Sequence, residues 1–124
     1  MSTLNVSNIT DGTTTVGTSY VVNGSAKAWI NFNGTGTIAT RDSLNVSSIS
    51  DDGAGITTIT YANSMANDDY ANGGMARELS GGAFAVIRYS NTFTTSQTKV
   101  ASANSSGSNI DCETCAVLTN GDLA

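Results

Sequence analysis

The stretch Lys27-Ala28-Trp29-Ile30-Asn31-Phe32-Asn33 decides the fold class, because its apolar side chains recur at every second position. Successive side chains of a β-strand point to opposite faces, so Ala28, Ile30 and Phe32 would share one face. Gly34 and Gly36 follow at once and break the pattern, as glycines do at turns. The stretch therefore predicts a half-buried strand that ends in a turn.

Similar alternation recurs along the chain, separated by turns rich in Gly, Asn and Asp. The runs are Leu44/Val46, Ile56/Ile59/Tyr61, Phe84/Val86/Arg88 and Cys115/Val117/Thr119. The step from Ile56 to Ile59 breaks the period of two and predicts a bulge. Short strands with turns between them are typical of an antiparallel β-sandwich or a small barrel. We therefore predict an all-β body at residues 26–124.

Residues 63–80 come closest to a helical pattern, but two adjacent glycines, Gly73 and Gly74, interrupt it. Residues 75–79 are predicted to form at most one short helical turn. Residues 67–74 are polar and glycine-rich, which predicts a loop. Because loops at the end of a sandwich commonly carry binding residues, Tyr70 and Met75 are candidate contact residues.

Residues 1–25, the N-terminal segment, differ from the body because their apolar residues are sparse. Leu4, Val6 and Ile9 are spaced too widely to close a core by themselves. An extended arm that pairs with neighbouring chains would bury them, and a symmetric trimer is the expected arrangement. A plain first strand of the same sandwich is the alternative.

The composition argues against several partners. Only five residues are basic and the net charge is -5, which argues against binding a nucleic-acid backbone. Every apolar run is shorter than the roughly 18 residues of a membrane-spanning helix, and residues 1–20 lack the pattern of a secretory signal. We therefore expect no nucleic-acid partner, no membrane insertion and synthesis in a cytoplasm.

The chain contains no histidine, which excludes a Ser-His-Asp triad and a histidine-ligated metal. Paired acidic residues suggest calcium ligands at first sight, but their spacing fits no EF-hand loop. Solvated turns are the favoured interpretation of these pairs: Asp51/Asp52, Asp68/Asp69 and Asp111/Glu113. We therefore expect neither enzymatic activity nor a cofactor.

Trp29 is the single tryptophan. A tryptophan can serve as an aromatic platform for a sugar ring or as the anchor of an interface. A tryptophan in the middle of a strand is more often a packing residue, in the core or between subunits. The packing interpretation is therefore favoured, and Trp29 is kept as a candidate contact residue.

Cys112 and Cys115 form a C-x-x-C motif. A redox motif would need a thioredoxin-like βαβ context, which the sequence lacks. A zinc site would need two further ligands, and the chain has no histidine and no other cysteine, so only a zinc shared between subunits would fit. Free thiols are the favoured interpretation, and a disulfide formed under oxidising conditions is second.

Residues 26–65 carry three elements in a fixed order. They are Lys27-Ala28-Trp29-Ile30-Asn31-Phe32-Asn33-Gly34, then Arg41-Asp42-Ser43-Leu44-Asn45-Val46-Ser47-Ser48-Ile49, and finally Met65 after a glycine turn and a strand. This order resembles a module of bacteriophage tail-fibre and tail-tip proteins, especially those of marine phages. Residues 1–12 are similar to the leader of such proteins. The polar segment after Met65 and the two cysteines depart from the module.

The resemblance implies a non-enzymatic virion protein, made in the host cytoplasm, that forms a small homotrimeric tail fibre or tip. Its expected partners are other virion proteins and a glycan or protein of the host surface, bound through several weak contacts at once. A capsid decoration or head-fibre protein that stabilises the shell is the structural alternative. A free carbohydrate-binding module is the alternative from another class.

Overall fold

The computed structural model describes residues 1–78, 83–88 and 93–124, of which residues 83–88 are described by their backbone course. The elements are β1 (Asn8–Thr10), β2 (Thr15–Gly17), α1 (Thr18–Gly24), β3 (Ala28–Asn33), β4 (Ala39–Leu44), β5 (Val46–Gly53), β6 (Ile56–Tyr61), β7 (Ala71–Arg77), β8 (Ala83–Arg88), β9 (Gln97–Ser102) and β10 (Thr114–Asn120). The chain is thus mostly β, with one short helix among the described residues.

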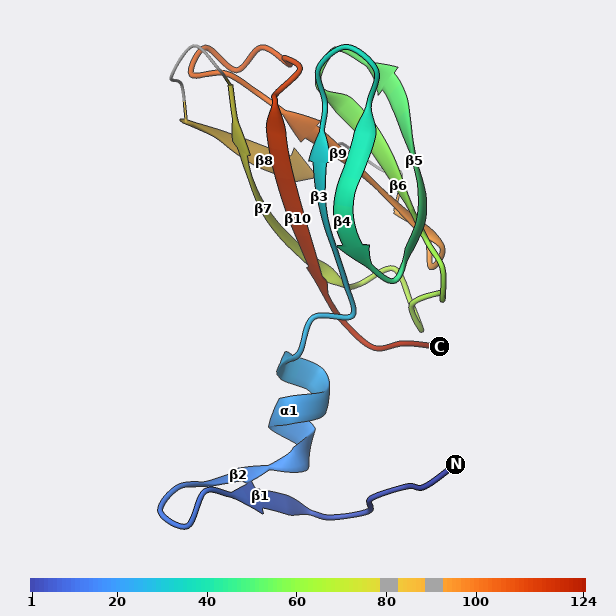
Figure 1. Cartoon of the computed structure of the whole chain (residues 1–124), viewed down its shortest axis with the longest axis vertical. Coiled ribbons are helices and arrows are strands. Elements are labelled where there is room, and N and C mark those ends of the chain that lie inside the picture. Colours follow the sequence, from blue (N-terminus) through green and yellow to red (C-terminus); the bar gives the residue numbers. More distant parts are fainter. Residues whose placement is uncertain (79–82, 89–92) are drawn as a thin grey trace.

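β3 to β10 form one antiparallel sheet in the order β4-β3-β10-β7-β8-β9-β6-β5. The sheet folds over, so that β4-β3-β10-β7, the first half, faces β9-β6-β5, the second half (Figure 1). β8 joins the halves: Ala83–Ala85 pair with β7, whereas Val86–Arg88 pair with β9. The predicted antiparallel β-structure is confirmed.

The core lies between the two halves and follows the predicted alternation in β3. Ala28, Ile30 and Phe32 are each 2% exposed. In β6 the register with β9 continues from Ile56 to Thr60, so the predicted bulge between Ile56 and Ile59 is wrong. Thr57 takes the buried position in place of Ile56, and the register shifts instead in β5.

A chain of polar side chains crosses the core between the two halves of the sheet. It runs from Tyr61 to Thr119 (3.2 Å), on to Asn72 (2.8 Å) and then to Thr98 (2.7 Å). Tyr61, Thr119 and Thr98 are buried. Because buried polar groups need partners, these hydrogen bonds fix β6, β10, β7 and β9 relative to one another.

Two predictions for residues 67–79 are wrong. Ala71–Gly74 are not a loop and Met75–Arg77 are not a helical turn, because both lie in β7. β7 pairs with β10 over its whole length and with β8 at its end, so hydrogen bonds on both sides outweigh the poor strand propensity of the two glycines. Leu79, at the end of the predicted turn, lies outside the described residues.

Asn45 forms the corner at which the chain crosses from β4 in the first half to β5 in the second. Its φ of 55° lies in the left-handed region, which asparagine tolerates better than most residues. Its side chain holds Asn63 through three hydrogen bonds of 2.7, 2.9 and 3.1 Å. The alternation of Leu44 and Val46 predicts one continuous strand here, and this corner replaces it.

Replacing Asn45 by alanine is expected to lower the free energy of unfolding by roughly 1–2 kcal/mol, because it removes these hydrogen bonds and disfavours the backbone conformation. Asn45→Gly keeps the conformation accessible and is expected to cost roughly half as much. Urea unfolding followed by circular dichroism measures both variants. Equal losses would contradict the role of the backbone conformation.

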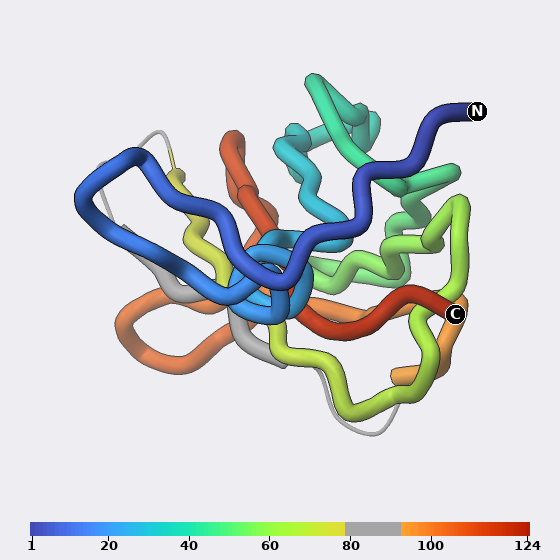
Figure 2. Tube along the Cα trace, turned by 90° about the horizontal axis from the view of Figure 1, so that it is seen from below, coloured from blue at the N-terminus to red at the C-terminus, as the bar shows by residue number. Residues whose placement is uncertain are grey.

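The N-terminal segment is not simply extended: β1 and β2 form a hairpin that leads into α1. Figure 2 shows this segment from below, with the hairpin loop reaching past the outline of the body. α1 has no buried residue, and its apolar residues Tyr20, Val21 and Val22 are consecutive, so they give no helical period that could have revealed the helix. Thr18 ties the helix to the hairpin by donating to the carbonyl oxygens of Val6 (3.0 Å) and Ser7 (3.1 Å).

Candidate interaction groove

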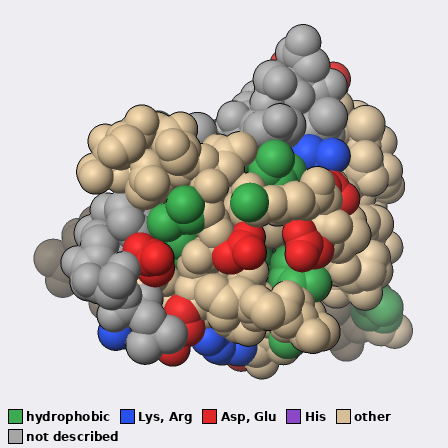
Figure 3. All heavy atoms as spheres, turned by 90° about the horizontal axis from the view of Figure 1, so that it is seen from above, with side chains coloured by type: hydrophobic (Ala, Val, Ile, Leu, Met, Phe, Trp, Pro, Cys, Tyr) green, Lys and Arg blue, Asp and Glu red, His purple; other side chains and the backbone are tan. Residues whose placement is uncertain are grey.

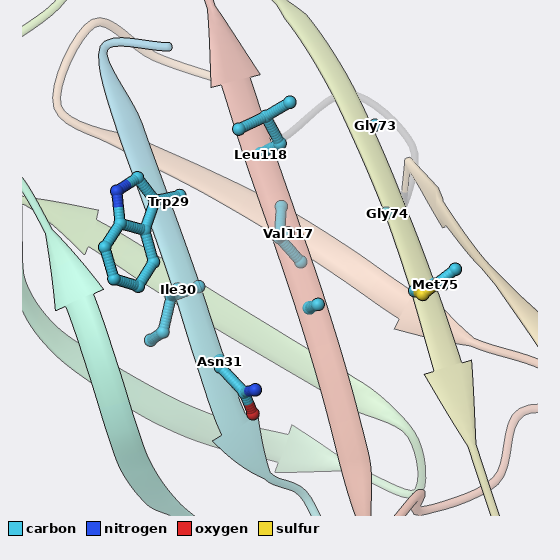
Figure 4. A pocket seen from close by; sticks show the side chains of 9 residues that line it. Trp29, Ile30, Asn31, Gly73, Gly74, Met75, Val117 and Leu118 are labelled. Carbon is cyan, nitrogen blue, oxygen red and sulfur yellow. The ribbon is translucent and has the colours of Figure 1, made fainter.

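A shallow groove lies on the outer face of the first half of the sheet, and its volume is about 560 Å³. Its walls come from β3, β10 and β7, three neighbouring strands of the sheet (Figure 4). The outward-facing residues that line it are Trp29, Asn31, Gly73, Met75, Ala116 and Leu118. The groove is therefore built on paired strands rather than on loops.

Strand register explains why these side chains meet. Leu118 pairs with Trp29 on one side and with Gly73 on the other. Trp29 pairs in turn with Leu44 of β4, so an apolar row crosses the strands. Directly paired residues share a face of the sheet. Leu44 and Leu118 remain 49% and 45% exposed, which leaves an apolar surface open to water.

Small residues form the floor of the groove. Gly73 faces outward opposite Leu118, and a Cβ atom built on it would meet nothing within 4 Å. Ala116 lies between Asn31 and Met75 in the next row. These two positions leave room between the indole of Trp29 and the thioether of Met75, which is 69% exposed.

Asn31 carries the single amide among the residues that line the groove, and the indole N–H of Trp29 is the other polar side-chain group. Asn31 Oδ1 already accepts a hydrogen bond from Nη1 of Arg41 at 3.3 Å. A sugar ring requires several polar partners for its hydroxyl groups, whereas an apolar side chain requires none. The lining therefore suits an apolar side chain better than a sugar.

The structure brings two of the predicted contact residues, Trp29 and Met75, into this one groove. It places the third, Tyr70, in the core at 4% exposure, where its ring meets that of Tyr61 edge to face and that of Phe93 at a tilt. The Tyr70 hydroxyl donates to the carbonyl oxygens of Thr94 (3.1 Å) and Gln97 (2.7 Å), so Tyr70 takes no part in the groove. Sequence alone did not indicate Leu118 as a groove residue. Its pairing with Trp29 and Gly73 places it on the outer face of the sheet.

The N-terminal segment presents a second apolar surface. Leu4, Val6 and Ile9, predicted to belong to an oligomerisation arm, are 83%, 39% and 46% exposed. Tyr20 and Val22 of α1, which sequence analysis did not single out, are also exposed, at 76% and 58%. The rest of the described chain thus leaves a large part of each of these side chains open to water.

Cys112 and Cys115 are free thiols, and both are buried. Cys115 Sγ lies 3.8 Å from the carbonyl oxygen of Cys112. Burial, together with the neighbouring Cys112, raises the pKa of Cys115 to about 11. No group of three or more His, Cys, Asp or Glu residues suited to a metal occurs among the described residues.

Both thiols are expected to react slowly with Ellman's reagent in the folded protein. A thiol with a pKa of about 11 is only about 0.1% thiolate at pH 8, against roughly a quarter for an unperturbed cysteine. Unfolding in guanidinium should release two reactive thiols per chain. A mass 2 Da lower than the reduced chain and no reactive thiol would instead indicate a disulfide.

Acidic side chains gather over the end of the body opposite the N-terminal segment (Figures 1 and 3). Here the turn between β5 and β6 meets the segment before β10, and Asp111 Oδ1 accepts a 2.6 Å hydrogen bond from the Gly55 amide. Asp52 pairs with Lys99 at 2.8 Å, and this contact lowers the pKa of the carboxyl group. Asp111 therefore holds the turn between β5 and β6, whereas Asp51 and Asp52 lie in β5 itself rather than in the predicted turn.

Comparisons with protein-family models, curated proteins and solved structures found no match for this chain. No helix within the described residues is long and apolar enough to cross a membrane. The groove, the N-terminal segment and the resemblance of residues 26–65 are therefore the features that bear on function.

Proposed function

We propose that this chain is a non-enzymatic structural protein of a phage appendage, which assembles with copies of itself and with other virion proteins. In this proposal the body is a β-sandwich and residues 1–25 serve as an arm for assembly. The observation that carries it is the presence of two uncovered apolar surfaces in one chain. One lies on the groove around Trp29, and the other lies on the N-terminal segment.

Two exposed apolar surfaces on one chain favour assembly over a monomeric state. Contiguous apolar patches on soluble proteins commonly mark interaction sites. Aromatic residues and methionine are enriched at the centre of interfaces. Trp29 and Met75 are of these types, and both are held on strands whose backbone is fixed by pairing. We infer that Trp29 is an interface anchor.

The phage assignment is supported by the resemblance of residues 26–65, which span β3 to β6. The end of the body opposite the N-terminal segment would then face outward from the virion. Weak contacts there, repeated over the copies of an oligomer, would give attachment to a host surface. The location on the tail rather than on the capsid belongs to the same proposal.

Cryo-electron microscopy of virions from the phage that encodes this chain tests the proposal. We expect density for the folded sheet on the tail. Density on the capsid alone would favour the shell-stabilising alternative, and the absence of the chain from purified virions would overturn the proposal.

Adsorption measurements test the attachment role separately. Purified protein added to host cells is expected to compete with virions and to slow their adsorption. Binding to a glycan array without any effect on adsorption would favour the carbohydrate-binding alternative.

A further inference from the structure

We propose that the groove on the first half of the sheet receives the N-terminal segment of a second copy of this chain, with the Tyr20 ring as the inserted side chain. This inference rests on the proposed function, because it specifies how the copies assemble. It makes the contact heterologous, arm to groove, rather than one identical patch against another.

The two surfaces match in chemistry. The groove is lined by apolar residues and one amide, without a charged side chain. The N-terminal segment carries a single charged side chain, Asp11, whereas five basic and nine acidic side chains give residues 26–124 a net charge of -4. Two acidic bodies repel each other, so a nearly neutral segment is the favoured occupant of the groove.

Tyr20 fits the groove best among the exposed residues of the segment. It is 76% exposed on α1, and its ring is the only aromatic group in residues 1–25. Aromatic rings pack favourably against a second ring and against a thioether, which Trp29 and Met75 supply across a floor of small residues. The hydroxyl group would stay near the wet rim or reach Asn31.

A contact within one chain is disfavoured by the hydrogen bonds at the junction of α1 and β3. Lys27 Nζ donates to the carbonyl oxygens of Val22 and Ser25, the latter at 2.8 Å. Asn120 Nδ2 of β10 donates to the Gly24 carbonyl oxygen at 3.0 Å. These bonds hold α1 beyond the end of the body (Figure 1), away from the groove of its own chain.

The groove is lined by nine residues, so it would receive the part of residues 1–25 around Tyr20, and the rest of the segment would lie beside it. A heterologous contact closes into a ring when the rotation between copies permits it. Two copies that exchange their segments reciprocally, or a ring of three or more copies, would fill every groove, and the homotrimer of the proposed function is one such ring.

Sedimentation of the purified full chain tests this arrangement with two variants. Tyr20→Ala removes the inserted ring from an exposed site, and Gly73→Leu fills the groove from a position with open space around it. Each variant is expected to raise the dissociation constant of the oligomer by roughly 30-fold or more, as removal of a well-packed aromatic anchor does. Tyr20→Phe, which keeps the ring, should assemble like the wild type.

Mixing the two variants gives the decisive result. A Tyr20→Ala chain keeps an intact groove and a Gly73→Leu chain keeps an intact segment, so the mixture should form dimers with one chain of each. Circular dichroism is the control that shows whether both variants fold. A monomeric wild type at 100 µM, unchanged assembly of either variant, or no dimer in the mixture would overturn the inference. A monomeric wild type would also remove self-assembly from the proposed function, whereas the other two results would leave it intact. The place of the chain in the virion is tested separately by the microscopy.

Discussion

Replacing Gly55 by alanine is expected to lower the free energy of unfolding by about 2–5 kcal/mol. Gly55 has a φ of +65°, in the left-handed region that costs other residues roughly 1–2 kcal/mol. A Cβ atom there would lie 2.5 Å from the Ile110 carbonyl oxygen and 2.6 Å from that of Ser102. Both atoms belong to the backbone, so the steric overlap can be relieved only by moving the end of β9 and the segment before β10, at a further cost of roughly 1–3 kcal/mol.

Moving that segment would break the contacts that close this end of the body. The Gly55 amide donates to Asp111 Oδ1 at 2.6 Å, and the Ser102 amide donates to the Gly55 carbonyl oxygen at 2.8 Å. Small domains are stable by only about 5–15 kcal/mol, so the expected loss is a large part of the total. Urea unfolding followed by the fluorescence of Trp29, the single tryptophan, measures it.

Gly36→Ala is the matched control. Gly36 has a φ of +62°, close to that of Gly55, but a Cβ atom there would meet nothing within 4 Å. We expect a loss of only about 1–2 kcal/mol, the cost of the backbone conformation alone. If both variants lower the free energy of unfolding by the same amount, the close packing around Gly55 does not contribute to the cost of its replacement.

Gly55 also shows how far sequence reasoning extends in this fold. The glycine-rich run after Asp51 predicts a turn, and the structure has one there between β5 and β6. The partners of that turn, Ser102 and Ile110, lie some fifty residues away and follow no local pattern. The same holds for α1, whose three apolar residues are consecutive and therefore give no helical period in the sequence.

The groove was predictable only in part for the same reason. Alternation in β3 places Trp29 opposite the buried face, and Met75 stands out as a large apolar residue after two glycines. Their proximity depends on β10 pairing with both β3 and β7, a strand order that connects distant parts of the chain. Residue types thus indicate candidates, whereas strand order decides which of them share a site.

Replacing Thr119 by valine is expected to lower the free energy of unfolding by about 2–3 kcal/mol, although the two side chains have nearly the same shape. The Thr119 hydroxyl gives its one hydrogen to Asn72 Oδ1 at 2.8 Å, so the Tyr61 hydroxyl must donate to Thr119 at 3.2 Å. Valine removes both the donor and the acceptor at a site that is 2% exposed, and each buried hydrogen bond is worth about 1 kcal/mol or more.

Thr119→Ser keeps the hydroxyl group and removes only the methyl group, so it distinguishes the contributions of the two. It should cost only about 1 kcal/mol because the hydrogen bonds to Tyr61 and Asn72 are kept. Tyr61→Phe and the double variant Tyr61→Phe/Thr119→Val complete a cycle whose coupling energy isolates the bond between β6 and β10. A coupling of at least about 0.5 kcal/mol would show that the polar chain joins the two halves of the sheet. A loss below about 0.5 kcal/mol for Thr119→Val would mean that apolar packing alone holds them together.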